Sequence, residues 1–132
     1  MTSGRTTSSE RVVERFIDEI LSGGRPEAAP ELMDNDLLRD RTAALRKAFA
    51  DLRVVIVRTV ARGPLVAVHL LASGTHTGPF QGGHPTGRIW TSSATAIFEV
   101  RHGRIVDFWL TWDTLDILDQ LGILVRTADS SA

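Results

Sequence analysis

Four consecutive strand-like runs after residue 52 constrain the fold of this chain more than any other feature. Each run is rich in β-branched and aromatic residues, and the four read LRVVIVRTV, LVAVHLLASGTH, RIWTSSATAIFEV and RIVDFWLTW. Turn signals separate them, namely RGP, a long glycine-rich stretch, and RHG. Strands that follow one another in this way pair as neighbours, so the sequence predicts a four-stranded antiparallel meander.

The longest connection reads GTHTGPFQGGHPTGR and holds five glycines, two prolines and two histidines. Glycine and proline at this density break helices and strands, so the stretch is predicted to be a loop that ties two strands together. Its histidines, His76 and His84, would contact a ligand if the loop lay at the mouth of a site. Histidines in surface loops usually have no such role.

Helical patterns precede the strands. Thr7 and Glu10 have capping-box spacing, and apolar residues then recur at helical spacing until SGG ends the pattern. The stretch RPEAAPELM predicts a short second helix with Pro26 in its first turn. A third helix is predicted to open at Asp40 and to run to Phe49.

The stretch DTLDILDQLGIL after the last strand predicts a short C-terminal helix, which Asp113 and Asp116 begin and Gly122 ends. Helices followed by an antiparallel sheet place the chain in the α+β class, as one domain over residues 9–124. Residues 1–8 and 125–132 have little to bury and are predicted to be flexible ends.

The composition excludes several classes of function. Cysteine is absent, which removes thiol nucleophiles, thiolate zinc sites and iron–sulfur clusters. Fifteen basic and sixteen acidic residues give a net charge of −1, so nucleic acid and anionic membranes are not expected partners. The four histidines lack metal-site spacing, so no metal is predicted. No run is long enough to span a membrane and the first residues do not read as a secretory signal, so a cytoplasmic location is expected.

The last two strands can be aligned from the sequence alone. Residues that oppose each other directly share a face of the sheet. If RHG closes a tight hairpin, the predicted pairs on one face are Val100–Val106, Phe98–Phe108, Ala96–Leu110 and Ala94–Trp112. That face is entirely apolar. The other face is mixed and carries an exposed tryptophan, Trp109, which is typical of a subunit interface.

The stretch from DLRVVIVRTVARGPLVAVHLLASGTHTGPFQGGHPTGR to FEVRHGRIVDFWLTWDTLDILDQLG resembles the SnoaL-like polyketide cyclases, in the superfamily built like nuclear transport factor two and ketosteroid isomerase. The most specific parts are GTHTG, PTGR, GRIVD and DQLG, in that order. The resemblance implies a cone-shaped α+β barrel, with helices packed across a strongly curved antiparallel sheet over a deep pocket. It also implies cofactor-independent ring closure in polyketide antibiotic biosynthesis, and a homodimer formed through the outer sheet face.

Members of that family use an aspartate and a histidine on neighbouring strands for acid–base chemistry. By the resemblance, the position of the histidine falls on Ala96 and that of the aspartate on Leu110, while a second histidine becomes Phe108. Neither alanine nor leucine exchanges a proton, so the site is predicted to be apolar. The predicted substrate-binding residues are Trp90, Ala94, Ala96, Phe98, Phe108, Leu110 and Trp112, which either line a pocket for a flat polyketide-like ligand or fill the core.

Two acid–base candidates remain. His69 would act as a base if a carboxylate held it in the pocket, or else it lies on the outer sheet face or in the core. Asp107 would act only if the mixed face were the inner one. Asp113 stands at the end of the last strand, but its spacing to Asp116 is that of a helix cap. His102, beside a glycine, is interpreted as a turn residue.

Three functions stay open at this stage. The leading prediction is an enzyme that cyclises or rearranges a polyketide-like intermediate in an apolar pocket, chiefly by folding a reactive substrate into shape. The second is a non-catalytic subunit that binds a small hydrophobic or aromatic ligand or a partner. The third is an accessory component of a polyketide hydroxylase.

Overall fold

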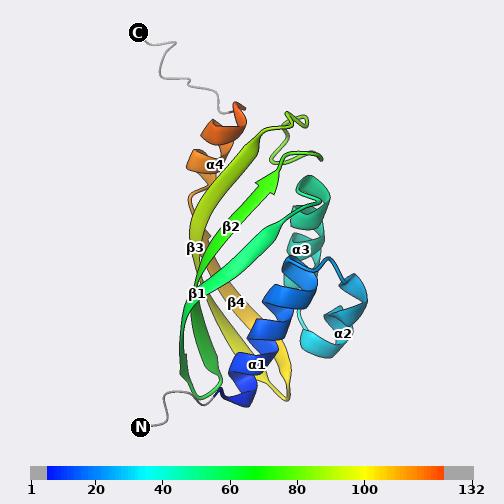
Figure 1. The fold of residues 1–132 in the computed structure, drawn as a ribbon. Coiled ribbons are helices and arrows are strands. Elements are labelled where there is room, and N and C mark those ends of the chain that lie inside the picture. The colour runs from blue at the N-terminus through cyan, green and yellow to red at the C-terminus, as the bar shows by residue number, and fades with distance from the viewer. Residues whose placement is uncertain (1–5, 124–132) are drawn as a thin grey trace.

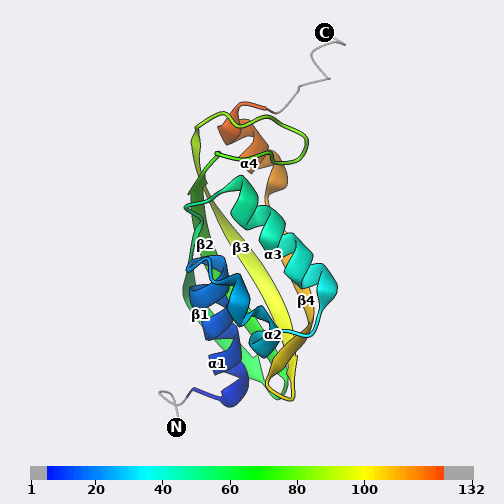
Figure 2. The ribbon, with the colours of Figure 1, turned by 90° about the vertical axis from the view of Figure 1, so that its right-hand side faces the viewer.

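The computed structural model describes residues 6–123, in which helices cover one face of a four-stranded sheet. The elements in order are α1 (Ser8–Arg15), η1 (Phe16–Leu21), η2 (Pro26–Ala28), α2 (Ala29–Leu32), α3 (Asp36–Ala48), β1 (Arg53–Arg62), β2 (Leu65–Thr75), β3 (Ile89–Arg101), β4 (Arg104–Trp112) and α4 (Thr114–Leu121). Helices α1, α2 and α3 lie on the same side of the sheet, and α4 lies at the end that also carries the β2–β3 loop (Figures 1 and 2). The predicted α+β class is confirmed.

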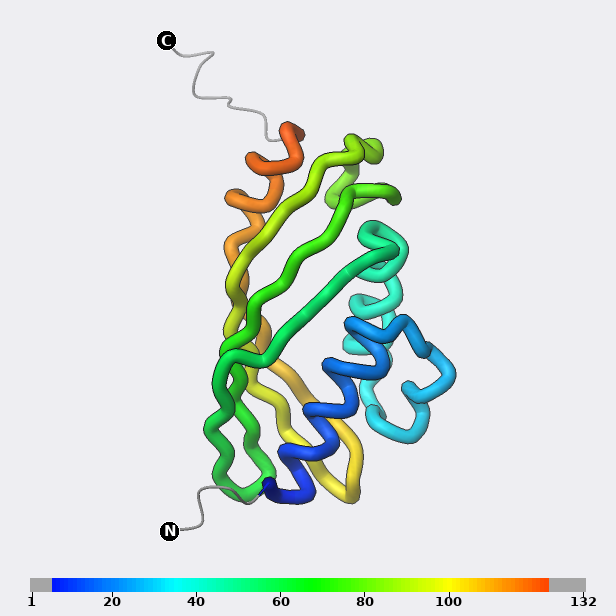
Figure 3. Tube along the Cα trace, viewed as in Figure 1, coloured from blue at the N-terminus to red at the C-terminus, as the bar shows by residue number. Residues whose placement is uncertain are grey.

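The sheet is an open antiparallel meander in the order β1-β2-β3-β4, as the sequence predicted. Both β1 and β4 are therefore edge strands. The pairing of β1 with β2 shifts between Ile56 and Arg58, which leaves Val57 without a direct partner. An extra residue of this kind bends a strand, and the bend in β1 is visible in Figure 3.

The face of the sheet under the helices, here called the inner face, forms the core together with α1 and η1. Along β2, every second residue from Val66 to Ala72 is buried, as expected for a strand with one covered face. The helical layer contributes Phe16, whose ring packs edge-on against Phe98 of β3 at 5.6 Å between centroids. The opposite face, here called the outer face, is exposed over most of its area.

The first helix begins with the predicted capping box. The Thr7 hydroxyl accepts a hydrogen bond from the backbone N–H of Glu10, and the Glu10 carboxylate accepts one from the N–H of Thr7. The helix continues as the π-helical segment η1, where Phe16, Ile17, Ile20 and Leu21 are buried.

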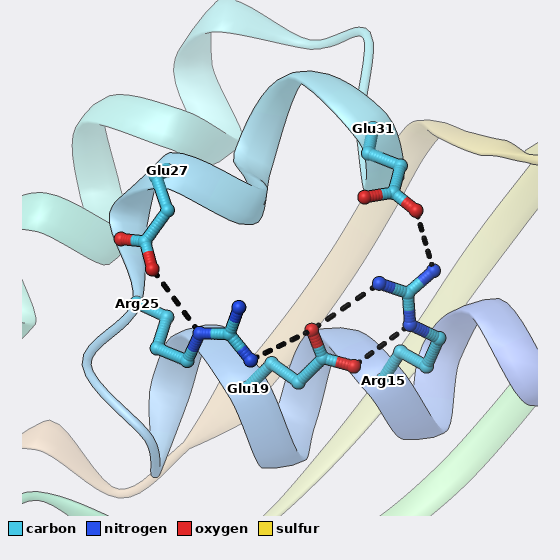
Figure 4. Close-up of polar contacts among 5 residues, drawn as sticks. All are labelled: Arg15, Glu19, Arg25, Glu27 and Glu31. Atoms are coloured by element: carbon cyan, nitrogen blue, oxygen red, sulfur yellow. Dashed lines mark hydrogen bonds and ion pairs between the residues drawn. The ribbon is translucent and has the colours of Figure 1, made fainter.

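Ion pairs connect α1 and η1 to the two short helical segments that follow (Figure 4). Arg15 binds both oxygens of Glu19 and also reaches Glu31 on α2, at 2.9 Å. Arg25 pairs with Glu27 at 3.1 Å and with Glu19 at 3.7 Å. The hydrogen bonds from Arg15 lower the pKa of Glu19 from its usual value. This network joins the short segments to the first helix.

The third helix begins earlier than the sequence predicted. We expected it to open at Asp40, but α3 starts at Asp36 with Asn35 as its N-cap. The Asn35 side chain accepts a hydrogen bond from the N–H of Leu38 and donates one to the carbonyl of Val106 in β4, both at 2.9 Å. A contact with a strand 71 residues away is invisible to local pattern reading.

Candidate functional site

The β3–β4 hairpin places the predicted site residues in register. Ala94 pairs with Trp112, Ala96 with Leu110, and Phe98 with Phe108, which confirms three of the four predicted pairs. The fourth is wrong, because Val100 pairs with Ile105. The hairpin closes through only two residues, His102 and Gly103, both with positive φ, and Val106 is the extra residue of a bulge.

These pairs, with Trp90, form a strip along the inner face that we call the β3–β4 strip. Its members are Trp90, Ala94, Ala96, Phe98, Phe108, Leu110 and Trp112. The four residues from β3 are all buried, Ala96 being 1% exposed. The three from β4 are accessible to solvent: Leu110 is 38% exposed, and Phe108 and Trp112 are partly exposed. The β3 half therefore fills the core, while the β4 half presents an open apolar surface.

The inner face carries no ionisable side chain on any of the four described strands. Every inner-face position that follows from the pairing is apolar, glycine, serine or threonine. Thr59 and Ser92 are its polar members. A general acid or base for a ligand on the β3–β4 strip would therefore have to come from outside the sheet's inner face.

A positive charge reaches the strip from the helical layer. The guanidinium carbon of Arg41, on α3, lies 5.8 Å from the centroid of the Phe108 ring. At this distance the cation is attracted by the negative face of the ring. The open part of the strip thus combines an apolar floor with one neighbouring cation.

The two acid–base candidates lie away from the strip. His69 pairs with Arg58 on one side and with Thr95 on the other, so it occupies the outer face. Asp107 pairs with Glu99, also on the outer face, and its carboxylate accepts a hydrogen bond from the N–H of Phe108. The structure does not bring either residue together with Ala96 and Leu110.

The other polar candidates have structural positions. The Asp113 carboxylate caps α4 by accepting a hydrogen bond from the N–H of Asp116, as predicted. His102 lies in the hairpin turn with a φ of 53°. His84 is exposed in the β2–β3 loop.

The β2–β3 loop closes one end of the inner face. It begins with His76, whose burial differs from the prediction. We expected a surface-loop histidine, but His76 is 1% exposed. Its Nδ1 accepts a hydrogen bond from the N–H of Thr86, which assigns the ring proton to Nε2. The signal was present in the sequence, because His76 continues the period-two alternation of the buried residues Ala72 and Gly74.

His76 belongs to a buried aromatic cluster at that closed end. The ring of Phe49 lies 6.0 Å from His76 and 4.9 Å from Trp90, and Trp90 packs edge-on against Trp112 at 5.9 Å. The Nε2 of His76 and the Nε1 of Trp90 are buried, and neither has a hydrogen-bond partner within residues 6–123. Buried donors usually have a hydrogen-bond partner, so a cluster with two unpartnered nitrogens is unusual.

Three surface grooves lie elsewhere on the molecule. One of about 640 Å³ is apolar and lies between α2 and α3, with Ile20, Ala29 and Met33 among its lining residues. A second of about 640 Å³ lies between η1 and the edge strand β1 and includes Asp18, Arg46 and Asp51. A third of about 500 Å³ lies on the outer face. None of the three is lined by the open residues of the β3–β4 strip.

The part of the chain that the structure describes lacks two further features. No cluster of three or more histidine, aspartate or glutamate side chains is placed to hold a metal ion there. No helix of residues 6–123 has the length and apolarity needed to cross a membrane.

A comparison with protein-family models shows the family of this chain. The family model described as SnoaL-like polyketide cyclase matches residues 35–121, which is more than half of the chain. The chain belongs to the SnoaL-like polyketide cyclase family. The match covers α3, the whole sheet and α4, and so includes both strands of the β3–β4 strip. A search of curated proteins finds no match.

Several solved structures share the fold of this chain at low sequence identity. A candidate SnoaL-like polyketide cyclase from Jannaschia sp. CCS1 has a TM-score of 0.81 and 20% identity, with 92% of this chain and 98% of that chain covered. IdmH, a candidate polyketide cyclase from Streptomyces antibioticus, gives 0.74 and 24%, with 88% and 99% covered. AclR, a candidate hydroxylase from Streptomyces galilaeus, gives 0.75 and 18%, with 89% and 97% covered. The cone-like α+β fold expected for the family is therefore confirmed.

Proposed function

We propose that this SnoaL-like protein is a small-molecule enzyme of natural-product biosynthesis, which cyclises or rearranges a polyketide-like intermediate without a cofactor and without the family's usual histidine–aspartate pair. The pairing of Ala96 with Leu110 on the inner face carries the proposal. By the resemblance, these two residues occupy the positions of the histidine and the aspartate. Their direct opposition in the ladder supports that alignment, because it keeps both positions on one face of the sheet.

The chemistry that suits such a site needs no proton transfer from the inner face. Holding a flexible, reactive substrate in a near-attack shape can contribute roughly 7–11 kcal/mol in favourable cases. Phe108, Leu110 and Trp112 offer the flat apolar surface on which a planar ligand would lie. A pericyclic or otherwise spontaneous type of ring closure fits this site better than an aldol reaction.

Product analysis with a synthetic polyketide-like triene, whose ring closes by electrocyclisation without proton transfer, tests the proposal. Such a triene cyclises slowly in buffer, and the protein is expected to accelerate one ring closure and to narrow the products seen by liquid chromatography and mass spectrometry. Leu110→Gln should reduce the acceleration, whereas Thr111→Val, on the outer face beside it, should not. Because none of the described strands presents a titratable side chain on the inner face, the acceleration should show no step between about pH 5 and 8.

Two results would contradict this function. Binding of the triene without any acceleration would favour the non-catalytic ligand-binding subunit. A step in the pH profile near the usual pKa of histidine would instead point to a base supplied from outside the inner face.

We also propose that two copies pair through their outer faces. Val60, Ala67, Ile97 and Trp109 are successive direct partners and form an apolar row straight across the outer face. Val60 is 69% exposed and Trp109 is 51% exposed, which is uncommon for large apolar side chains on one face. A twofold axis parallel to the strands would stack β1 of one copy over β4 of the other, and thus bring Arg62 near Asp107.

A further inference from the structure

The guanidinium of Arg41 has different surroundings from that of Arg39, its neighbour on α3. Arg39 forms a 2.8 Å ion pair with Asp36 and lines the α2–α3 groove together with Asp40. Arg41 does not line that groove, and its guanidinium lies over Phe108 of the β3–β4 strip. The helix therefore directs one arginine toward its own acidic residue and another toward the apolar surface.

The guanidinium of Arg41 has no acidic partner among the described residues, where no carboxylate lies within ion-pair distance of it. A guanidinium that lies over an aromatic ring and forms no ion pair keeps its N–H groups available as donors. Those donors match a carboxylate or another oxyanion in a bidentate geometry.

The charge of Arg41 should determine which ligands bind, because the β3–β4 strip around it is apolar. A planar ligand on Phe108, Leu110 and Trp112 would meet no other charged side chain from the described inner face. Leu110 is 38% exposed, so the floor beside Phe108 is accessible without any rearrangement of the sheet.

We infer that Arg41 makes the β3–β4 strip selective for planar ligands that carry an anionic oxygen, such as a carboxylate, a phenolate or an enolate. The inference rests on the proposed function, because it names the ligand class of the same site. The same guanidinium would stabilise the negative charge of a phenolate or enolate that reaches the site already ionised, so that no base is needed there.

Two fluorescent probes with one aromatic skeleton separate charge recognition from apolar binding. N-phenylnaphthylamine is neutral, and anilinonaphthalene sulfonate is the same skeleton with an added sulfonate. Both are titrated into the full chain and into the variants Arg41→Gln, Arg41→Lys and Arg39→Gln. Arg39→Gln is the matched control, because it removes the same charge from the same helix but from a paired arginine that faces the other groove.

The inference predicts that the wild-type chain binds the anionic probe more tightly than the neutral one. Arg41→Gln should weaken the anionic probe by about three- to tenfold and leave the neutral probe within about twofold. The affinity of Arg41→Lys for the anionic probe should lie between those of the wild type and Arg41→Gln, because lysine keeps the positive charge but lacks the paired N–H donors of the guanidinium. Arg39→Gln should change neither affinity. Circular dichroism and thermal midpoints verify that each variant is folded.

The two probes, together with Leu110→Gln, distinguish a failure of the Arg41 inference from a failure of the proposed function. If the neutral probe binds and Leu110→Gln weakens it, the apolar site stands. The inference is then overturned if Arg41→Gln affects the anionic probe no more than Arg39→Gln does. If the wild-type chain binds neither probe, or Leu110→Gln leaves both affinities unchanged, the proposed apolar site fails and the inference with it.

Discussion

Trp90 lies across Gly74, its direct partner in the β2–β3 ladder, so that the indole Nε1 is 3.3 Å from the point that a Cβ at residue 74 would occupy. The same point is 2.9 Å from the Cβ of Phe49, which is fully buried. The absence of a side chain at Gly74 is therefore what allows the aromatic cluster to close one end of the inner face.

Gly74→Ala should destabilise the fold by about 1–3 kcal/mol, because the added methyl group overpacks a buried cluster. Urea unfolding of the variant measures this loss. Gly63→Ala is the control: its φ of +57° disfavours alanine, but no atom lies within 4 Å of the added group, so only about 1 kcal/mol is expected. Equal losses in the two variants would contradict the packing described for Gly74.

The carboxylate of Asp51 should make part of the stability depend on pH. It accepts hydrogen bonds from the N–H of Thr75 at 2.8 Å and from its hydroxyl at 2.7 Å, and these bonds lower its pKa from the usual 3.8. A lowered pKa in the folded state means that the unfolded chain binds more protons. The stabilisation is therefore fully present above the unfolded pKa and is lost as the pH falls through the folded pKa.

Urea unfolding of wild-type protein and Asp51→Asn at several pH values tests this dependence. The wild-type advantage should be at most about 1 kcal/mol near pH 7, because the carboxylate is exposed, and should shrink below about pH 4. An advantage that stays constant over this range would show that the charge of Asp51 contributes nothing.

Histidine and aspartate substitutions at the two positions that the resemblance assigns to the family's pair should differ in their cost to stability. Ala96 is 1% exposed, so Ala96→His forces an imidazole into a filled core and should cost about 3 kcal/mol or more. Leu110 is 38% exposed, so Leu110→Asp should cost about 1 kcal/mol or less. Urea unfolding measures both losses. Aldol-type turnover gained by the double variant would indicate a cyclase that has lost its acid–base pair, and similar losses at both positions would contradict the exposures described here.

The sequence was sufficient for the elements whose signals are local. The four strands, the Thr7 capping box, the Asp113 cap and the face shared by Ala96 and Leu110 follow from periodicity and turn residues, and the structure confirms them. These features depend on residues close together along the chain, where pattern reading is strongest.

The remaining features depend on contacts between distant segments. The start of α3 is fixed by the Asn35 side chain, which reaches the carbonyl of Val106. The burial of His76 depends on Phe49 and on a loop that folds back through Thr86. The position of Arg41 over Phe108 joins a helix to the last strand. The alternation along β2 points to the burial of His76, but the partners in all three contacts are distant along the chain and cannot be named from local patterns.

Disruption of the outer-face row should separate two copies of the chain. If Trp109 stacks against Val60 of a second copy, Trp109→Asp places a charge in an apolar contact and should weaken association at least about tenfold. Sedimentation equilibrium over a range of concentrations measures the dissociation constant. Leu115→Asp is the control, because Leu115 is 65% exposed on α4 and lies outside the outer-face row. A wild-type chain that stays monomeric, or a dimer that both variants leave intact, would rule out pairing through this row.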